Sequence, residues 1–402
     1  MQWKYPNTDC AEQDFNIVPF SPSKVIVLVV KEIEAKSILR KHKKIDSWFL
    51  SAYGMNLYRG CTHNCVYCDG RAEGYFVEGE FGRDVSVKVN ALEVLCHELD
   101  PHRKRTPFKS GYIMVGGGVG DSYQPLEEDY QLTRKTLQLL CEKKLPVHIL
   151  TKSTLVKRDV DLLRRINEQS KAIVSFSFSS TNETISKVFE PGVSSPQKRL
   201  ETISYFKENG IACGMFLLPV IPFITDTKEL MEKTIQDAQE AGVDFIIFGG
   251  MTLKQGKQTE YFLNVLRQYD PTLEISYQRL YPGDTWGQAR PEYYDSLHQI
   301  FCALMRRYRI PIRIPPRLFH GLLSKNDLVV VILEHLDYFL KLEGKKSPFG
   351  YAAYSISKLK KPLSTMLDEL STIKGVGTTT EHLIREILRT GHSSLYEQFL
   401  HE

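Results

Sequence analysis

The sequence NLYRGCTHNCVYCDG, residues 56–70, places three cysteines within eight residues: Cys61, Cys65 and Cys68. The chain has eight cysteines among 402 residues, which is too sparse for a disulfide framework, so this crowding points to a metal site. An iron–sulfur cube normally takes four cysteine thiolates, and a cube held by three leaves one iron open to another ligand.

Zinc binding and unrelated free thiols are the alternatives to an iron–sulfur cube at these cysteines. Zinc would take His63 as its fourth ligand, although structural zinc sites usually combine two ligand pairs that are separated in sequence. A single short loop would then have to wrap a whole tetrahedron. The spacing favours the iron–sulfur cube.

Strand-like and helix-like segments alternate around the cysteines. Apolar, β-rich runs predict strands at 51–57, 112–115, 147–151, 172–178, 211–217 and 243–248. Amphipathic runs predict helices at 91–99, 126–142, 159–167, 196–209 and 228–241, with a late unit around 291–314. Repeats of this kind form parallel βαβ units, so we predict an α/β fold built as a partial or open barrel. An open doubly wound sheet would give the same alternation, and in both folds the active site lies at the carboxyl ends of the strands.

Composition places the chain among ordinary folded proteins. Hydrophobic residues make up 42% and charged residues 25%, which excludes disordered, collagen-like and low-complexity classes. The formal net charge of +4 does not decide whether the partner is a polyanion. The first residues lack the apolar core of a signal peptide, and no run approaches about 18 uncharged apolar residues. We therefore expect a cytoplasmic protein with no membrane contact.

Two flanking regions differ from the central repeat. Residues 1–48 carry a basic run at 40–44 and are expected to form an N-terminal extension with a strand and a helix. After the prolines at 311–316 the pattern becomes helical, and a linker rich in Lys, Gly and Pro follows at 341–348. We predict a barrel domain at 49–320 and a small helical domain at 321–402.

The C-terminal domain contains a turn with the features of a nucleic-acid contact. Helical patterns flank Gly375-Val376-Gly377, and Thr378 with Glu381 predicts a capping box. The arrangement resembles a helix-hairpin-helix motif, in which backbone N–H groups at a helix N-terminus suit a phosphate. The residues expected to bind a nucleic-acid backbone are Lys374, Gly375, Val376 and Gly377. A simple αα-hairpin, or one used for protein contacts, is the alternative.

The pattern Cys61-x-x-x-Cys65-x-Tyr67-Cys68 resembles the hallmark of the radical S-adenosylmethionine (SAM) superfamily. That resemblance implies a partial (β/α)6-type barrel and a [4Fe–4S] cluster on the three cysteines. The open iron would chelate the amino and carboxylate groups of SAM, with Tyr67 near the adenine. It also implies an external electron donor, reductive cleavage of SAM to a 5′-deoxyadenosyl radical, and hydrogen abstraction from a substrate.

Later segments extend the resemblance over about residues 50–310 and towards the spore photoproduct lyase-like branch. The motifs DSYQP at 121–125, LTKS at 150–153 and EPG at 190–192 point to that branch. The SAM-binding residues that it implies are Gly116, Gly117, Lys152, Ser177 and Arg199.

Each of these residues has chemistry that suits the role that the resemblance implies. Gly116 and Gly117 would let the backbone approach the SAM amino group, because glycine has no side chain in the way. Lys152 would meet the SAM carboxylate, and Ser177 the ribose or methionine part. The alternatives are an ordinary glycine turn, a solvent-facing strand edge at Ser177, and a surface position for Arg199.

Two features depart from the spore photoproduct lyase pattern. Its hydrogen-donating cysteine after the second strand has no counterpart in residues 116–120, and Asp69 stands where it has a tyrosine. Cys213 offers another thiol, although a lone cysteine in an apolar run usually serves for packing. We therefore do not expect the same hydrogen relay.

The sequence leads to three functional hypotheses. The first is a radical SAM enzyme that abstracts hydrogen from a nucleic acid, in lesion repair or in modification of a base or sugar. The second keeps this chemistry but assigns a peptide or small-molecule substrate, with the hairpin used for assembly. The third is a non-catalytic, zinc-stabilised binding protein.

Overall fold

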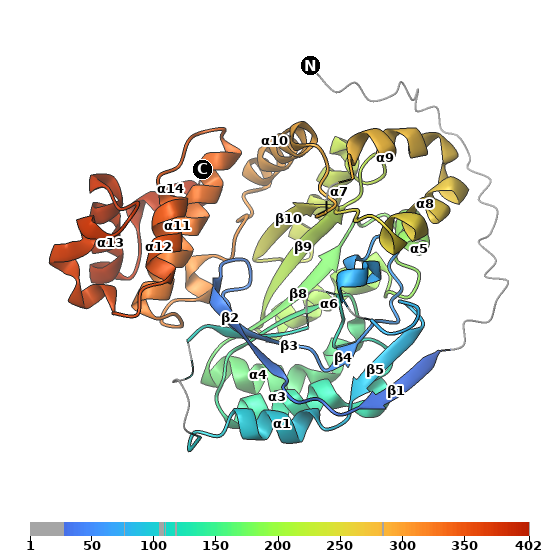
Figure 1. The fold of residues 1–402 in the computed structure, drawn as a ribbon, viewed down its shortest axis with the longest axis horizontal. Coiled ribbons are helices and arrows are strands. Elements are labelled where there is room, and N and C mark those ends of the chain that lie inside the picture. The colour runs from blue at the N-terminus through green and yellow to red at the C-terminus, as the bar shows by residue number, and fades with distance from the viewer. Residues whose placement is uncertain are drawn as a thin grey trace.

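The computed structural model describes residues 28–75, 77–103, 108, 110–116, 119–283 and 285–401. In this part of the chain a seven-stranded sheet has the strand order β10-β9-β8-β7-β6-β3-β2, and β1, β5 and β4 form a second, small sheet. Figure 1 shows the large sheet curled, with helices outside the curve and the C-terminal helices beside the β2 edge.

Six strands of the large sheet run parallel, which confirms the predicted α/β repeat and partial barrel. They are β3 (Ser51–Met55), β6 (Tyr112–Val115), β7 (Val147–Thr151), β8 (Ala172–Phe178), β9 (Ala212–Val220) and β10 (Phe245–Gly250). Antiparallel β2 (Leu39–Asp46) pairs with β3 at the edge. The small sheet consists of β1 (Val29–Ile33), β4 (Tyr58–Arg59) and β5 (Asp84–Lys88).

Most of the helices between the strands follow the predicted amphipathic runs, whereas those at 183–189, 257–269 and 274–280 were not predicted. In the barrel region they are α1 (Ala91–Glu98), α2 (Glu127–Tyr130), α3 (Leu132–Glu142), α4 (Val160–Gln169), α5 (Glu183–Phe189), α6 (Pro196–Glu208), α7 (Lys228–Glu240), α8 (Lys257–Tyr269), α9 (Glu274–Leu280) and α10 (Pro291–Tyr308). Short 3-10 helices add η1 (Asp69–Arg71), η2 (Glu73–Tyr75), η3 (Thr154–Asp159), η4 (Pro271–Leu273) and η5 (Pro316–Leu318).

Two predicted elements of the barrel are wrong in detail. The single helix expected at 126–142 is split at Gln131, which has a left-handed φ of 52°, and the Glu127 carboxylate accepts the Thr133 N–H at 2.9 Å. In the late unit at 291–314, α10 is present but no strand follows it. Pro311 has no N–H, so only its carbonyl oxygen joins the sheet, 2.9 Å from the Ile246 nitrogen.

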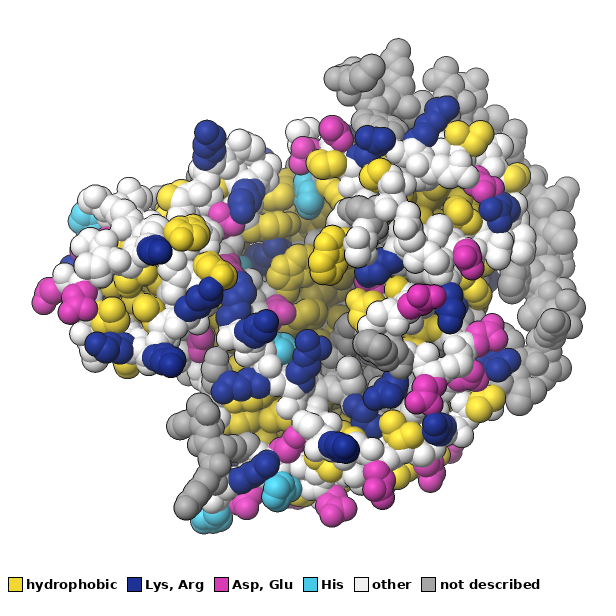
Figure 2. All heavy atoms as spheres, in the orientation of Figure 1, with side chains coloured by type: hydrophobic (Ala, Val, Ile, Leu, Met, Phe, Trp, Pro, Cys, Tyr) yellow, Lys and Arg dark blue, Asp and Glu magenta, His cyan; other side chains and the backbone are white. Residues whose placement is uncertain are grey.

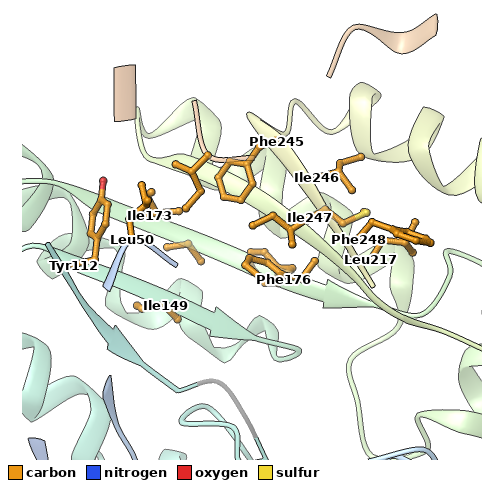
Figure 3. Packing of buried hydrophobic residues seen from close by; sticks show 14 of the residues in the cluster. Leu50, Tyr112, Ile149, Ile173, Phe176, Leu217, Phe245, Ile246, Ile247 and Phe248 are labelled. Atoms are coloured by element: carbon orange, nitrogen blue, oxygen red, sulfur yellow. The ribbon is translucent and has the colours of Figure 1, made fainter. Parts of the chain in front are cut away.

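The core lies between the outer, convex face of the curled sheet and the helices that cover it. Every residue of β8 is buried, and the neighbouring strands contribute mainly aliphatic and aromatic side chains. Figure 3 shows Ile149, Ile173, Phe176, Leu217 and Phe245 in this packing. Parallel strands covered on both faces have such near-continuous apolar runs.

The described part of the N-terminal region contains two strands. Residues 1–27 lie outside the described part, and residues 28–48 contain β1 and β2 but not the expected helix. The basic run at 40–44 lies on β2, where Arg40, Lys41, Lys43 and Lys44 are exposed. The run thus belongs to the edge strand of the barrel sheet.

The C-terminal region is helical, as predicted. It comprises α11 (Lys325–Leu342), α12 (Phe349–Ser357), η6 (Leu363–Thr365), η7 (Leu367–Thr372), α13 (Thr378–Thr390) and α14 (Ser394–His401). Helix α11 contacts α12, α13, α14 and also β2. The barrel and the helical region therefore meet along the β2 edge.

No helix of the described residues has the length and apolar character needed to cross a membrane.

A buried histidine inside the barrel makes the fold sensitive to acid. The His148 ring on β7 lies 3.1 Å from the Phe49 carbonyl oxygen and 2.8 Å from the Ser175 hydroxyl. Burial lowers the pKa of His148 to about 4, whereas in the unfolded chain it titrates near 6.5. The unfolded state therefore binds the extra proton as the pH falls below 6.5, so stability is lost between about pH 6.5 and 4.

We expect His148→Gln to reduce this acid sensitivity. Between pH 6.5 and 5 the wild-type protein should lose about 2 kcal/mol more unfolding free energy than the variant, at about 1.4 kcal/mol per pH unit. Urea denaturation at each pH measures the difference. Equal pH slopes for the two proteins would contradict the neutral, buried state of His148.

Candidate active site

The three clustered cysteines lie in the loop after β4 and face one cavity. Cys61 and Cys65 are buried, Cys68 is half-buried, and all three line a cavity of about 90 Å³ with Lys152 and Ser177. Cys68 also begins η1, because its sulfur accepts the Gly70 N–H at 3.4 Å. Parallel strands β7 and β8 end at this cavity, so the loop stands where barrel folds place their chemistry.

The loop is pinned from two sides. The Gly192 nitrogen donates to the His63 carbonyl at 3.0 Å, and a Cβ at Gly192 would lie only 2.6 Å from the Thr62 carbonyl oxygen. On the other side the Arg71 guanidinium donates to the Cys65 carbonyl at 3.2 Å and lies 3.4 Å from the centre of the Tyr261 ring. The backbone that carries the cysteines is therefore fixed by packing and hydrogen bonds.

His63 is occupied by other partners and does not suit the zinc alternative. Its Nδ1 lies 2.9 Å from the Gly192 carbonyl oxygen and its Nε2 lies 3.0 Å from Asp121 Oδ2. Within the described ranges, no three His, Cys, Asp or Glu side chains are grouped to hold a single metal ion. A [4Fe–4S] cube distributes its thiolate ligands over different irons, so the donor set of three cysteines fits the cube.

Burial keeps the cysteine thiols of the loop protonated. Burial raises the pKa of Cys65 to about 12 and raises that of Cys61 well above its ordinary value. Buried thiols of this kind become thiolates when a metal centre compensates their charge. Binding of a metal centre at this loop would therefore release protons from the thiols.

Glu190 lies at the centre of the polar network beside the cavity. Its fully buried carboxylate accepts hydrogen bonds from Lys152 at 2.9 Å, from Arg199 at 2.6 Å and from the Tyr67 hydroxyl. Burial alone would raise the pKa of Glu190, but the charges of Arg199 and Lys152 outweigh it and hold that pKa well below the usual range. The Glu190 carboxylate is therefore ionised, and it places a negative charge beside the cavity that the cysteines line.

Asp121 forms a second anchor at the end of β7. Its carboxylate accepts the Thr151 hydroxyl at 2.8 Å and the Lys152 N–H at 2.7 Å, in addition to its contact with His63. Burial works against the ionised form, yet His63 and the backbone donors lower the pKa of Asp121 overall. The cysteine loop and the β7 end are therefore held in one register.

Some of the residues expected to bind SAM line the cavity, and others lie behind its wall. Lys152 and Ser177 line the cavity itself. Gly116 ends β6 with a φ of 81°, and a Cβ there would lie 2.9 Å from the Leu150 carbonyl oxygen, so the position requires glycine. Gly117 lies outside the described residues.

Tyr67 and Arg199 stand behind the cavity. Tyr67 is buried with its hydroxyl on Glu190. Arg199 is fully buried in α6, so the surface alternative is wrong for it, and it donates to the Ser177 carbonyl at 2.5 Å. Arg199 therefore contacts the back of the site rather than its open face.

Two further residues make contacts that the sequence analysis did not predict. Asp69 accepts the Lys254 ammonium and the Thr252 hydroxyl, each at 2.6 Å, and buried Gln258 donates to the Tyr67 carbonyl at 2.9 Å. The loop and helix after β10 thus clamp the cysteine loop. The only signal for Asp69 was its departure from the tyrosine of the resembling branch.

Cys213 is fully buried on β9 and is not among the cavity-lining residues, in line with packing.

The C-terminal turn has a form that differs partly from the prediction. Lys374, Gly375 and Gly377 are exposed, and Val376 is buried. Gly377, not Thr378, is the N-cap of α13, and the Glu381 carboxylate bonds to Arg385, so the predicted capping box is wrong. The segment before the turn, η7, is a 3-10 helix. The turn still offers exposed backbone at a helix N-terminus.

Comparisons with known proteins agree with this geometry. A family model described as "Radical SAM superfamily" matches residues 55–236. An uncharacterised protein of Mycobacterium tuberculosis is 29% identical over 262 residues, covering 64% of this chain and 75% of the relative. One of Methanocaldococcus jannaschii is 30% identical over 224 residues, covering 56% and 78%.

A solved structure shares the fold. Spore photoproduct lyase complexed with dinucleoside spore photoproduct superimposes with a TM-score of 0.52 at 17% sequence identity, over 69% of this chain and 79% of that one. At this identity the similarity concerns the fold.

The Glu190 network predicts a measurable loss of stability on neutralisation. We expect Glu190→Gln to lower the free energy of unfolding by about 3 kcal/mol, because Lys152 and Arg199 lose their buried counter-charge. Since the pKa of Glu190 is depressed in the folded state, this contribution is complete above about pH 4.5 and declines at lower pH. Urea denaturation at pH 7 and at pH 3.5 tests both expectations.

Glu208→Gln is the matched control, because Glu208 is exposed at the end of the same helix as Arg199. That variant should change the free energy of unfolding by less than about 0.5 kcal/mol. If Glu190→Gln behaved like Glu208→Gln at pH 7, the central role of the carboxylate would be wrong.

Proposed function

This chain belongs to the radical SAM superfamily, and on that premise we propose that it abstracts a hydrogen atom from a nucleic acid, in lesion repair or in modification of a base or sugar. Its cofactors are a [4Fe–4S] cluster and SAM. When bound and reduced, they supply the 5′-deoxyadenosyl radical that removes the hydrogen. Cys61, Cys65 and Cys68 are the residues that would hold the cluster.

Residues around the cavity would bind and orient SAM. Lys152 presents an ammonium at the cavity wall while Glu190 fixes its position, so it suits the SAM carboxylate. The Ser177 hydroxyl donates to the Leu218 carbonyl at 2.9 Å, so its oxygen remains to accept a hydrogen bond from the ribose or methionine part. Gly116 allows the backbone to approach the amino group. Arg199 holds the Ser177 carbonyl and therefore acts as a positioning residue.

Positive charge around the central hollow is the observation that carries the nucleic-acid assignment. Figure 2 shows Lys and Arg side chains gathered beside the hollow where β2 meets the C-terminal helices. Exposed Arg40, Lys41 and Lys43 belong to β2, and Lys374 lies at the hairpin turn. Such groups suit a phosphate backbone. The shared fold with an enzyme solved together with dinucleoside spore photoproduct supports the same substrate class.

Anaerobic reconstitution tests the cofactor assignment. We expect about four irons per chain in the wild-type protein, and 5′-deoxyadenosine on reduction with SAM. Alanine at Cys61, Cys65 or Cys68 should abolish both, whereas Cys141→Ala, at a buried cysteine outside the cavity, should retain them. Full iron loading in all three cysteine variants would contradict the ligand assignment.

Salt-dependent binding tests the substrate class. We expect binding to a labelled oligonucleotide to weaken steeply with salt, and Lys374→Glu to weaken it and flatten the salt slope by about one. Lys198→Glu, at an exposed lysine of α6, is the control and should have a smaller effect. Deuterium transfer from a labelled oligonucleotide into 5′-deoxyadenosine would then locate the reacting hydrogen. Binding unaffected by salt, with deuterium arriving from a peptide instead, would favour the second hypothesis.

A further inference from the structure

Helix α12 exposes two aromatic rings on its solvent face. Ala352, Ala353 and Ile356 form its buried side, while Tyr351 is 58% and Tyr354 is 50% exposed. A solvated helix face normally carries polar and charged side chains, so two large rings there are unusual. About half of the surface of each residue is therefore left open to solvent.

The two rings are stacked with nearly parallel planes. They are three residues apart, which brings them to the same side of the helix, and their centroids lie 6.4 Å apart with planes inclined by 22°. The Lys358 ammonium lies 3.9 Å from the centre of the Tyr354 ring and bonds to its hydroxyl. The Lys358 ammonium therefore lies over one side of the Tyr354 ring.

The hairpin turn packs against this same surface. Gly375 has a φ of 86°, and a Cβ built on it would lie 2.7 Å from Tyr351 Cδ1 and 3.0 Å from the Ala352 nitrogen. The backbone of the turn therefore lies directly beside the first ring. We call this combination the aromatic–hairpin surface; it consists of Tyr351, Tyr354, Lys358, Lys374 and Gly375.

The charge around the aromatic–hairpin surface suits a polyanion. Residues 346–376 contain five lysines, all exposed, against two acidic residues, Asp368 and Glu369, which are exposed on η7. The excess is confined to this segment, because residues 321–402 as a whole contain ten basic and ten acidic residues. Aromatic faces interleaved with lysines are the features with which proteins bind single strands, because every base has a π-face and every nucleotide a phosphate.

We propose that the aromatic–hairpin surface binds a single-stranded stretch of nucleic acid, with bases stacked on Tyr351 and Tyr354 and phosphates at Lys358, Lys374 and the turn. This inference rests on the proposed nucleic-acid substrate and adds that unpaired bases are recognised. In a duplex the base faces are hidden by stacking, so a duplex can use only the lysines and the turn.

Fluorescence anisotropy with the full chain tests this inference. The probes are an end-labelled single-stranded DNA of about 12 nucleotides, the RNA of the same sequence, and the DNA duplex. We expect both single strands to bind more tightly than the duplex at the same salt concentration. A preference for one strand chemistry would identify the source of the ligand as DNA or RNA.

Substitutions separate stacking from charge. We expect Tyr351→Ala and Tyr354→Ala each to raise the Kd for the single strands at least about fivefold, and to leave the duplex Kd within about twofold. Tyr351→Phe and Tyr354→Phe should restore single-strand binding, because the ring remains. Ile275→Ala removes an apolar side chain that is 60% exposed on α9 and should have no effect. Thermal unfolding of each variant establishes that it is folded.

The outcomes distinguish this inference from the proposed function. If the alanine variants bind single strands like the wild type while Lys374→Glu weakens binding, the stacking role is wrong and the nucleic-acid substrate stands. Equal binding of single strand and duplex by the wild type would likewise overturn the stacking role. If neither single strand nor duplex binds, both proposals fail.

Discussion

One buried carboxylate, that of Glu190, organises the site. It takes hydrogen bonds from the end of β7 through Lys152, from α6 through Arg199 and from the cysteine loop through Tyr67. An unpaired charge at this depth would be strongly unfavourable, so the three donors and the carboxylate must come together as a unit. The cavity wall is therefore held together by the buried charges that join these three segments.

This arrangement accounts for the way a short loop presents three thiols in one direction. The loop itself has little regular structure, but Gly192 meets its backbone on one side and Arg71 on the other. Gln258 joins it to the far end of the sheet through the Tyr67 carbonyl. Residues from distant segments thus supply the order that the loop lacks, and they do so at the carboxyl ends of the parallel strands.

Sequence patterns predicted the elements well, and the contacts between them poorly. The six parallel strands were predicted from β-rich apolar runs, because strands that are buried on both faces have nearly continuous apolar sequences. The Tyr67–Glu190 and Tyr67–Gln258 contacts join residues 123 and 191 positions apart, and no local pattern encodes such pairs. The break at Gln131 was missed because a left-handed residue leaves the amphipathic period intact. The cysteines were found because three thiols so close together in the sequence are themselves a sign of a metal site.

The edge strand β2 has a consequence for the behaviour of the chain in concentrated solution. An open sheet that ends in a free strand invites the same strand of another molecule to add to it, which is a common route to aggregation. Here that strand carries Arg40, Lys41, Lys43 and Lys44, all exposed. Lys44 pairs with Glu334 of α11, and this helix also contacts the strand. The helix and the remaining exposed cations together keep the edge of the partial barrel from pairing with a second molecule.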